Sequence, residues 1–324
     1  MGMVSSYLLR EVAVSIMPTS LAVALAGAQD ARVIAASSRA SLDRALRCAA
    51  ELSLAVVSDD AVLVGAFQRA TGLRRGSGGP EVRVGPGTVH VALALAHPAA
   101  LIPCDEKRIV NRHVRPLLRA LTRAGGTRAA AHYFGRDWIS VAHRPVAWVG
   151  FGHDATTRRT LFEAFVAVRT PFALTERASF LGKPHGTLEA LAGTAVDEGR
   201  LVQAIADAYS GDAASVPFEW PDAPSLDGDA SAEPPWAAVV DEAIGPLGAG
   251  PDAHGAFRVG GDLLVSRDAL ARLEALAATA PEDDVGRIVD ETLASPGVAL
   301  DGVRSLGSVR DVIVAARRSY GNRT

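Results

Sequence analysis

The residues best suited to chemistry lie in one glycine-rich segment, Arg-Arg-Gly-Ser-Gly-Gly at residues 74–79. Glycines let backbone N–H groups approach an anion, and arginines pair with phosphate or carboxylate through two parallel hydrogen bonds. The segment lacks the Gly-Lys-Ser/Thr of a phosphate-binding loop and the glycine spacing of a dinucleotide fingerprint. It therefore predicts either an anion-binding loop or a tight turn. The candidate ligand-binding residues are Arg74, Arg75, Gly76, Ser77, Gly78 and Gly79.

Two lysines, two cysteines and a histidine are further candidates. Lys107 and Lys183 are the only lysines, and Lys183 falls in a predicted loop, where it could reach a ligand or stay solvated. Cys104 precedes a predicted helix whose N-terminus could lower the pKa of a thiol, although an ordinary cysteine is the favoured interpretation. Cys48 and Cys104 are too few for a disulfide framework or a cysteine-based zinc site. His153 could orient a phosphate or sit in a polar turn.

Hydrophobic periodicity predicts the elements that must position these residues. Alternating apolar residues on both sides of Gly85-Pro86-Gly87 predict a strand, a tight turn and a second strand over residues 82–93. Apolar residues spaced by three and four predict helices over residues 38–54 and 108–124. Further strands are expected at 61–67, 138–141, 146–151 and 162–168, and further helices at 188–191, 200–209, 268–277, 284–293 and 308–319.

A change of composition divides the chain. Asp, Ser, Pro, Gly and Ala dominate residues 210–235, and we interpret this stretch as a linker because so long a loop is uncommon inside a compact domain. We expect a leader at residues 1–19, and Met17 is a candidate for the natural start, which would leave 16 residues before it. A catalytic-type domain is expected at 20–209 and a small α+β accessory domain at 236–324.

The overall composition limits the classes of function. The chain has 324 residues of which 48% are hydrophobic, which suits two folded domains and excludes a mainly disordered protein. A net charge of −3 without a long basic run gives no support for a nucleic-acid partner. No apolar run reaches the ~20 residues of a membrane span, and Pro18 interrupts the signal-peptide-like stretch at 12–28. We expect a cytoplasmic protein with no membrane partner.

Five short stretches carry motifs in a consistent order. Residues 64–69, Val-Gly-Ala-Phe-Gln-Arg, lead to the loop at 74–79, and Gly-Pro-Gly-Thr follows at 85–88. Gly-Arg-Asp-Trp-Ile stands at 135–139, and Val-Gly-Gly-Asp-Leu-Leu at 259–264. Together they resemble the lipoate–protein ligases and octanoyltransferases of the biotin/lipoate ligase family over nearly the whole chain. The resemblance implies an α+β fold, a mixed sheet with packed helices followed by a small C-terminal α+β accessory domain.

The resemblance also implies a reaction. Such ligases condense lipoate or another short carboxylic acid with ATP and Mg²⁺, and pass the acyl group to a lysine of a small lipoyl-type carrier protein. Residues 74–79, Gly150 and His153 would then bind substrate and nucleotide. Asp137 would lie near the nucleotide as a magnesium ligand, since Mg²⁺ prefers oxygen ligands. Asp137 and Lys183 are the residues that we expect to be catalytic.

The sequence departs from the family's motifs in two places. The stretch His143–Gly150 matches the ligases' Gly-Arg-Lys-Ile-Ser-Gly turn, but Pro145 stands where the lysine should be. Proline offers neither charge nor a hydrogen-bond donor, and Trp148 replaces a small residue and should narrow the pocket. The octanoyltransferase cysteine is also absent from the matching stretch, residues 160–164.

Two functions therefore remain nearly balanced. The first is a lipoate–protein ligase-like acyltransferase that forms or uses an acyl-adenylate. The second is a family member without catalytic activity, which binds a small molecule or a carrier protein. An enzyme of the same fold that acts on a different acid is a third possibility, because function belongs to sites rather than folds.

Overall fold

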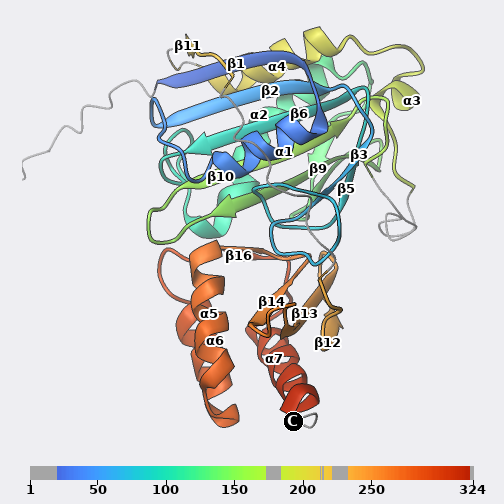
Figure 1. Ribbon diagram of the computed structural model, residues 1–324. Coiled ribbons are helices and arrows are strands. Elements are labelled where there is room, and N and C mark those ends of the chain that lie inside the picture. The colour runs from blue at the N-terminus through green and yellow to red at the C-terminus, as the bar shows by residue number, and fades with distance from the viewer. Residues whose placement is uncertain (1–19, 173–183, 212, 214, 221–232, 322–324) are drawn as a thin grey trace, which may run out of the picture.

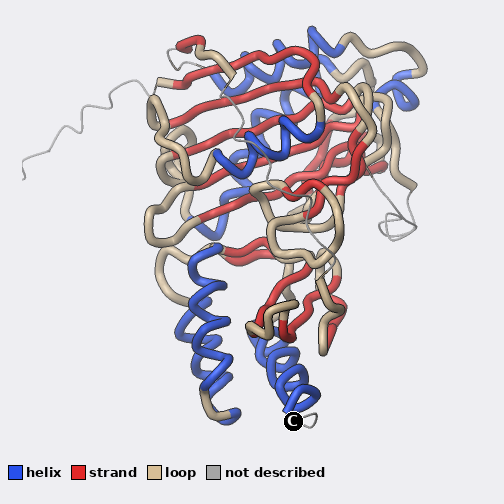
Figure 2. Tube along the Cα trace, in the orientation of Figure 1, coloured by secondary structure: helices blue, strands red, loops and turns tan. Residues whose placement is uncertain are grey.

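The computed structural model describes residues 20–172, 184–211, 213, 215–220 and 233–321 (Figure 1). An eight-stranded mixed sheet dominates this part of the chain, and the C-terminal residues form a smaller body beneath it (Figures 1 and 2). The strand order is β11-β1-β2-β6-β10-β9-β8-β7. The strands are β1 (Leu21–Gln29), β2 (Ala50–Val57), β6 (Thr88–Leu95), β7 (Ala131–Tyr133), β8 (Trp138–Val141), β9 (Arg144–His153), β10 (Thr160–Ala167) and β11 (Ser215–Pro217).

Both faces of this sheet are covered. Helices α2 (Ile109–Ala124) and α4 (Glu198–Ser210) pack on one face, with the short α3 (Leu188–Ala192) nearby. Helix α1 (Ala31–Ala40) and a small sheet of β3 (Ala61–Val64), β4 (Leu73–Arg74) and β5 (Val82–Val84) pack on the other. Because both faces are covered, central strands such as β6 and β10 are buried along their whole length.

The C-terminal body has its own apolar core. Its sheet consists of β12 (Ala238–Asp241), β13 (Pro246–Pro251) and β14 (Phe257–Gly261), and β15 (Leu264–Val265) pairs with β16 (Leu300–Asp301). Helices α5 (Arg267–Thr279), α6 (Val285–Leu293) and α7 (Leu306–Gly321) pack together with this sheet. Both bodies mix helices and strands, so the expected α+β class is confirmed.

The main error of the sequence prediction lies at residues 38–54. The predicted helix is wrong: the structure has helix α1 before it, a turn region at 41–49 and strand β2 from Ala50. Ala50, Leu52 and Leu54 are all buried on one face of the sheet, so alternation with period two prevails over the helical spacing. The strand, turn and strand over 82–93 are confirmed, although β5 and β6 join different sheets.

The segment predicted as a linker contains a strand of the main sheet. Residues 215–217 form β11, which pairs in parallel with β1 at the edge of the main sheet, and residues 221–232 lie outside the described part. No helix in the described ranges has the length and apolar character needed to cross a membrane.

Candidate functional site

The glycine-rich loop lies between the main sheet and the C-terminal body, and its backbone donors are already engaged. Four of its six N–H groups donate hydrogen bonds of 2.8–3.0 Å to other parts of the protein: Arg75 to the Val64 carbonyl, Gly76 to the Ser38 hydroxyl, Gly78 to the Phe151 carbonyl and Gly79 to the Leu263 carbonyl. These groups tie the loop to α1, β9 and the C-terminal body. They are therefore not directed at an open anion site.

The two arginines of the loop are engaged in the same way. Arg75 is completely buried, and its guanidinium donates to the carbonyls of Leu63, Gly78 and Pro80 at 2.7–3.0 Å. Burial lowers the pKa of Arg75 to about 10, so it remains charged at neutral pH. Arg74 donates to the carbonyls of Gly65, Ala66 and Gln68. Both side chains hold the loop in place.

Beneath the loop, Arg75 joins a buried polar network on the sheet. Its Nε donates to the Ser77 hydroxyl at 3.0 Å, and this hydroxyl donates to Glu163 on β10. The other oxygen of Glu163 lies 2.9 Å from His90 Nε2. Burial raises the pKa of Glu163, but His90, Arg75 and Ser77 outweigh it and hold that pKa below its usual value. Arg75 therefore faces a buried carboxylate of its own protein.

Trp148 fills the space above two of the predicted binding glycines. A Cβ at Gly79 would come within 2.8 Å of the indole, and a Cβ at Gly150 within 2.5 Å of it. The indole is 1% exposed, and the Arg75 guanidinium stacks over it at 4.1 Å. The hollow that the glycines leave is thus occupied by a side chain of this protein.

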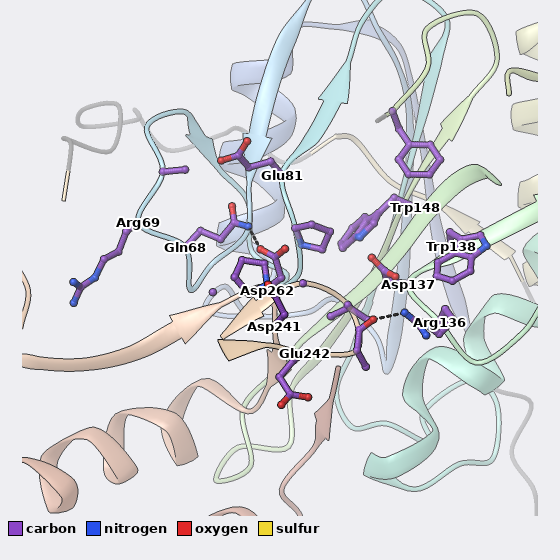
Figure 3. Close-up of a pocket in the computed structure, with 18 of the residues that line it drawn as sticks. Gln68, Arg69, Glu81, Arg136, Asp137, Trp138, Trp148, Asp241, Glu242 and Asp262 are labelled. Atoms are coloured by element: carbon purple, nitrogen blue, oxygen red, sulfur yellow. Dashed lines mark hydrogen bonds between the residues drawn. The ribbon is translucent and has the colours of Figure 1, made fainter. Parts of the chain in front are cut away.

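A cavity of about 580 Å³ lies next to Trp148, between the main sheet and the C-terminal body (Figure 3). Of the predicted catalytic and binding residues that the structure describes, Asp137 lines it, and so does Trp148, which was expected to narrow the pocket. Its C-terminal wall, which includes Trp236, Asp241 and Glu242, was not predicted from sequence, although the 259–264 motif contains Asp262. Gln68 of the loop region donates to Asp262 and so links the two walls (Figure 3).

Asp137 is the most unusual group in the cavity. It is 7% exposed, and its Oδ1 has no hydrogen-bond partner. Burial raises the pKa of Asp137 to about 7; Arg136 opposes this rise, and Asp262 and Asp301 add to it. No group of three or more His, Cys, Asp or Glu side chains among the described residues could hold a metal ion. Asp137 as a magnesium ligand therefore stays a prediction, and such an ion would need most of its ligands from phosphate or water.

The remaining candidates lie elsewhere. His153 is completely buried at the end of β9, where its Nε2 donates to the Gly297 carbonyl at 3.0 Å and so fastens the C-terminal body. Burial raises the pKa of Cys104 to about 11, which is opposite to the activation that a helix N-terminus could give. Lys183 lies outside the described residues. The described chain lines the cavity on both sides of residues 173–183, with Phe172 before them and His185 after them.

Comparison with known proteins identifies the fold. No protein-family model matches the sequence, and no curated protein matches it. P. falciparum LipL1, solved in complex with lipoate, is 13% identical and superposes over 91% of this chain and 99% of its own with a TM-score of 0.60. The bipartite lipoate protein ligase of Thermoplasma acidophilum is 14% identical over 62% of this chain and 88% of its own (TM-score 0.47). Lipoate-protein ligase A bound with ATP is 13% identical over 63% and 89% (TM-score 0.46).

The similarity to LipL1 confirms the expected class of fold. The chain has the α+β fold of the lipoate–protein ligases, as the motif order at residues 64–88 and 135–139 implies. The similarity to LipL1 extends through the C-terminal body, because it covers nearly the full length of both chains.

Proposed function

We propose that this protein binds a ligand between its main sheet and its C-terminal body without forming an acyl-adenylate. The glycine-rich loop supports this proposal most strongly. Four of its six N–H donors and both of its guanidinium groups bond to the protein itself, so they are unavailable to phosphate or carboxylate. Electrostatic catalysis needs donors aimed at the site where charge develops.

Two further side chains agree with a loss of catalysis. Pro145 on β9 supplies neither the charge nor the donor of the family lysine, and the described residues that line the cavity include no lysine. Trp148 occupies the hollow beside Gly79 and Gly150. An acyl chain would have to displace a fully buried indole and its stacked arginine.

Lipoate binding tests this proposal. Calorimetry should detect no lipoate binding to the wild-type protein, whereas Trp148→Gly should bind lipoate because it vacates the hollow. Trp138→Gly is the matched control: it removes the indole opposite Trp148 on the neighbouring strand, but that indole does not lie over the two glycines. Both changes cost about 3–5 kcal/mol of stability, so folding is checked by circular dichroism. Micromolar lipoate binding by the wild-type protein would contradict the part of the proposal in which Trp148 closes the acyl hollow, whether or not either variant folds.

A specific observation favours a second candidate, a lipoate–protein ligase-like acyltransferase. Phe172 and His185 bring the chain to the cavity on both sides of residues 173–183, and Lys183 is the one lysine in this stretch. In this candidate Lys183 and Asp137 are catalytic, ATP with Mg²⁺ activates lipoate or another short carboxylic acid, and a lipoyl-type carrier protein accepts the acyl group. The same fold acting on a different acid is a variant of this candidate.

Alanine variants of Lys183 and Lys107 test the second candidate, with Lys107→Ala as the control. If carrier acylation is detected, Lys183→Ala should reduce its rate at least 100-fold. Lys107→Ala should leave the rate unchanged, because Lys107 lines a different, smaller pocket at the start of α2. Equal rates in both variants would remove Lys183 from the candidate site.

A further inference from the structure

The cavity beside Trp148 carries an excess of negative charge. Its described lining residues include five carboxylates and two guanidiniums: Glu81, Asp137, Asp241, Glu242 and Asp262, against Arg69 and Arg136. Figure 3 shows these carboxylates on both walls, with Asp137 on the sheet side and Asp241, Glu242 and Asp262 on the C-terminal side. Low-dielectric walls strengthen such a field and raise the local concentration of ions of opposite sign.

The two arginines of the cavity wall bond to the protein backbone. Arg69 donates to the Gly250 carbonyl at 2.7 Å and to the Pro234 carbonyl at 3.1 Å, and its guanidinium stacks over Trp236 at 3.7 Å. Arg136 donates to the Ala243 carbonyl, and its guanidinium lies 5.2 Å from the centre of the Trp138 ring. These contacts fix both groups against the walls, so neither presents the two-pronged donor pair that binds a carboxylate.

Asp137 is a buried carboxylate of the cavity wall with one oxygen that lacks a partner. Its Oδ1 accepts no hydrogen bond, although the side chain is more than nine-tenths buried and lines the cavity. A buried carboxylate oxygen without a donor destabilises the folded protein, because the lost hydration is not replaced. A ligand with a charged N–H donor would relieve this destabilisation, because charge-assisted hydrogen bonds are the stronger ones.

The other lining groups define the rest of the ligand. Trp138, Trp148, Phe172 and Trp236 contribute aromatic rings to the cavity wall. A guanidinium already lies over each of the three indoles, so these rings supply packing area for an apolar group of the ligand rather than for its cation. A volume of about 580 Å³ lies in the usual range for small-molecule sites.

We propose that this cavity binds a small organic amine in its protonated form, with the ammonium group at Asp137 and an apolar or aromatic group against the tryptophans. This inference rests on the proposed ligand-binding function and names the ligand class. It departs from the carboxylic acid and nucleotide that the resemblance implies, since both are anions and the described walls carry three more negative than positive groups.

A matched set of three ligands tests whether the cavity prefers a cation, an anion or a neutral molecule. Calorimetry on the full-length protein at pH 8 would compare 2-phenylethylamine, 3-phenylpropionate and the neutral 3-phenylpropanol, which share the aromatic group and differ in the polar one. The amine should bind at least tenfold more tightly than the alcohol, and the carboxylate should bind most weakly. Tighter binding of the carboxylate, or no binding of the amine at millimolar concentration, would overturn the inference.

Two variants test the place of binding. Asp137→Asn should weaken amine binding at least tenfold and leave the alcohol unaffected. Asp283→Asn removes the same charge from an exposed position outside this cavity, and it should change neither affinity. Equal amine affinity in wild type and Asp137→Asn would overturn the assignment to Asp137. If the amine does not bind, only the inference about the ligand is overturned. The proposed loss of adenylation is tested separately, by lipoate binding and by pyrophosphate exchange.

Discussion

Replacing Arg75 with alanine is expected to destabilise the protein rather than to weaken the binding of a ligand. The change removes hydrogen bonds to three carbonyls and to Ser77, and it leaves the buried carboxylate of Glu163 without its nearby guanidinium. Removing one partner of a buried charged pair costs about 3–5 kcal/mol, which is a large part of a typical stability of about 5–15 kcal/mol. Urea unfolding followed by fluorescence would measure the loss.

Arg74→Ala is the matched control for this prediction. Arg74 also donates to three carbonyls, but it is only partly buried and contacts no buried carboxylate. We expect a smaller loss for Arg74→Ala, about 1–2 kcal/mol. An Arg75→Ala protein with wild-type stability and weakened ATP binding would instead assign the guanidinium to a nucleotide site, as the family resemblance implies.

Replacing Asp137 with asparagine is expected to stabilise the protein above neutral pH. The carboxyl has a pKa of about 7 in the folded protein and a model value of 3.8. Between these values the unfolded chain releases its proton while the folded chain keeps it, so stability falls as the pH rises from about 4 to 7. The difference between the two pKa values corresponds to a loss of roughly 4 kcal/mol in the free energy of unfolding. Asparagine cannot ionise, so the variant should gain up to about this amount at pH 8 and nothing at pH 4.

Asp154→Asn should behave in the opposite way. Burial raises the pKa of Asp154, but hydrogen bonds from Thr157 and Arg267 outweigh it and lower that pKa. Its ionised form therefore stabilises the fold, and the variant should lose stability at pH 8 and less at pH 3. Unfolding curves for both variants at several pH values would show the two trends. If Asp137→Asn differed from wild type equally at pH 5 and pH 8, the raised pKa of Asp137 would be wrong.

The sequence predicts the fold well where burial and local pattern agree. Helix α2 has a clear apolar stripe and ends at Gly125-Gly126, and strands β8, β9 and β10 lie close to their predicted positions. The pattern fails at residues 41–57, where frequent alanines and leucines satisfy both a helical and a strand period. Tertiary pairing of β2 with β1 and β6 decides between the two, and this pairing is not a local property of the sequence.

The site was less predictable for a physical reason. Residue type shows that Arg75 can bind an anion, but it does not show that Glu163, 88 positions away in the chain, is the anion nearest to it. Likewise, Trp148 predicts a narrower pocket, while its contact with Gly79 depends on how the loop crosses β9. Trp236 and Glu242 reach the cavity only because the C-terminal body packs against the loop.

We infer that this protein has the fold of the lipoate–protein ligases without activating an acid. Acid-dependent ATP–pyrophosphate exchange, measured with Mg²⁺ and lipoate, octanoate, biotin and other short carboxylates, tests it most directly. An active lipoate–protein ligase assayed alongside provides the positive control. We predict no exchange above background with any acid, because the loop donors are engaged and Pro145 replaces the lysine. Exchange that depends on one of these acids would contradict the claim and identify the substrate.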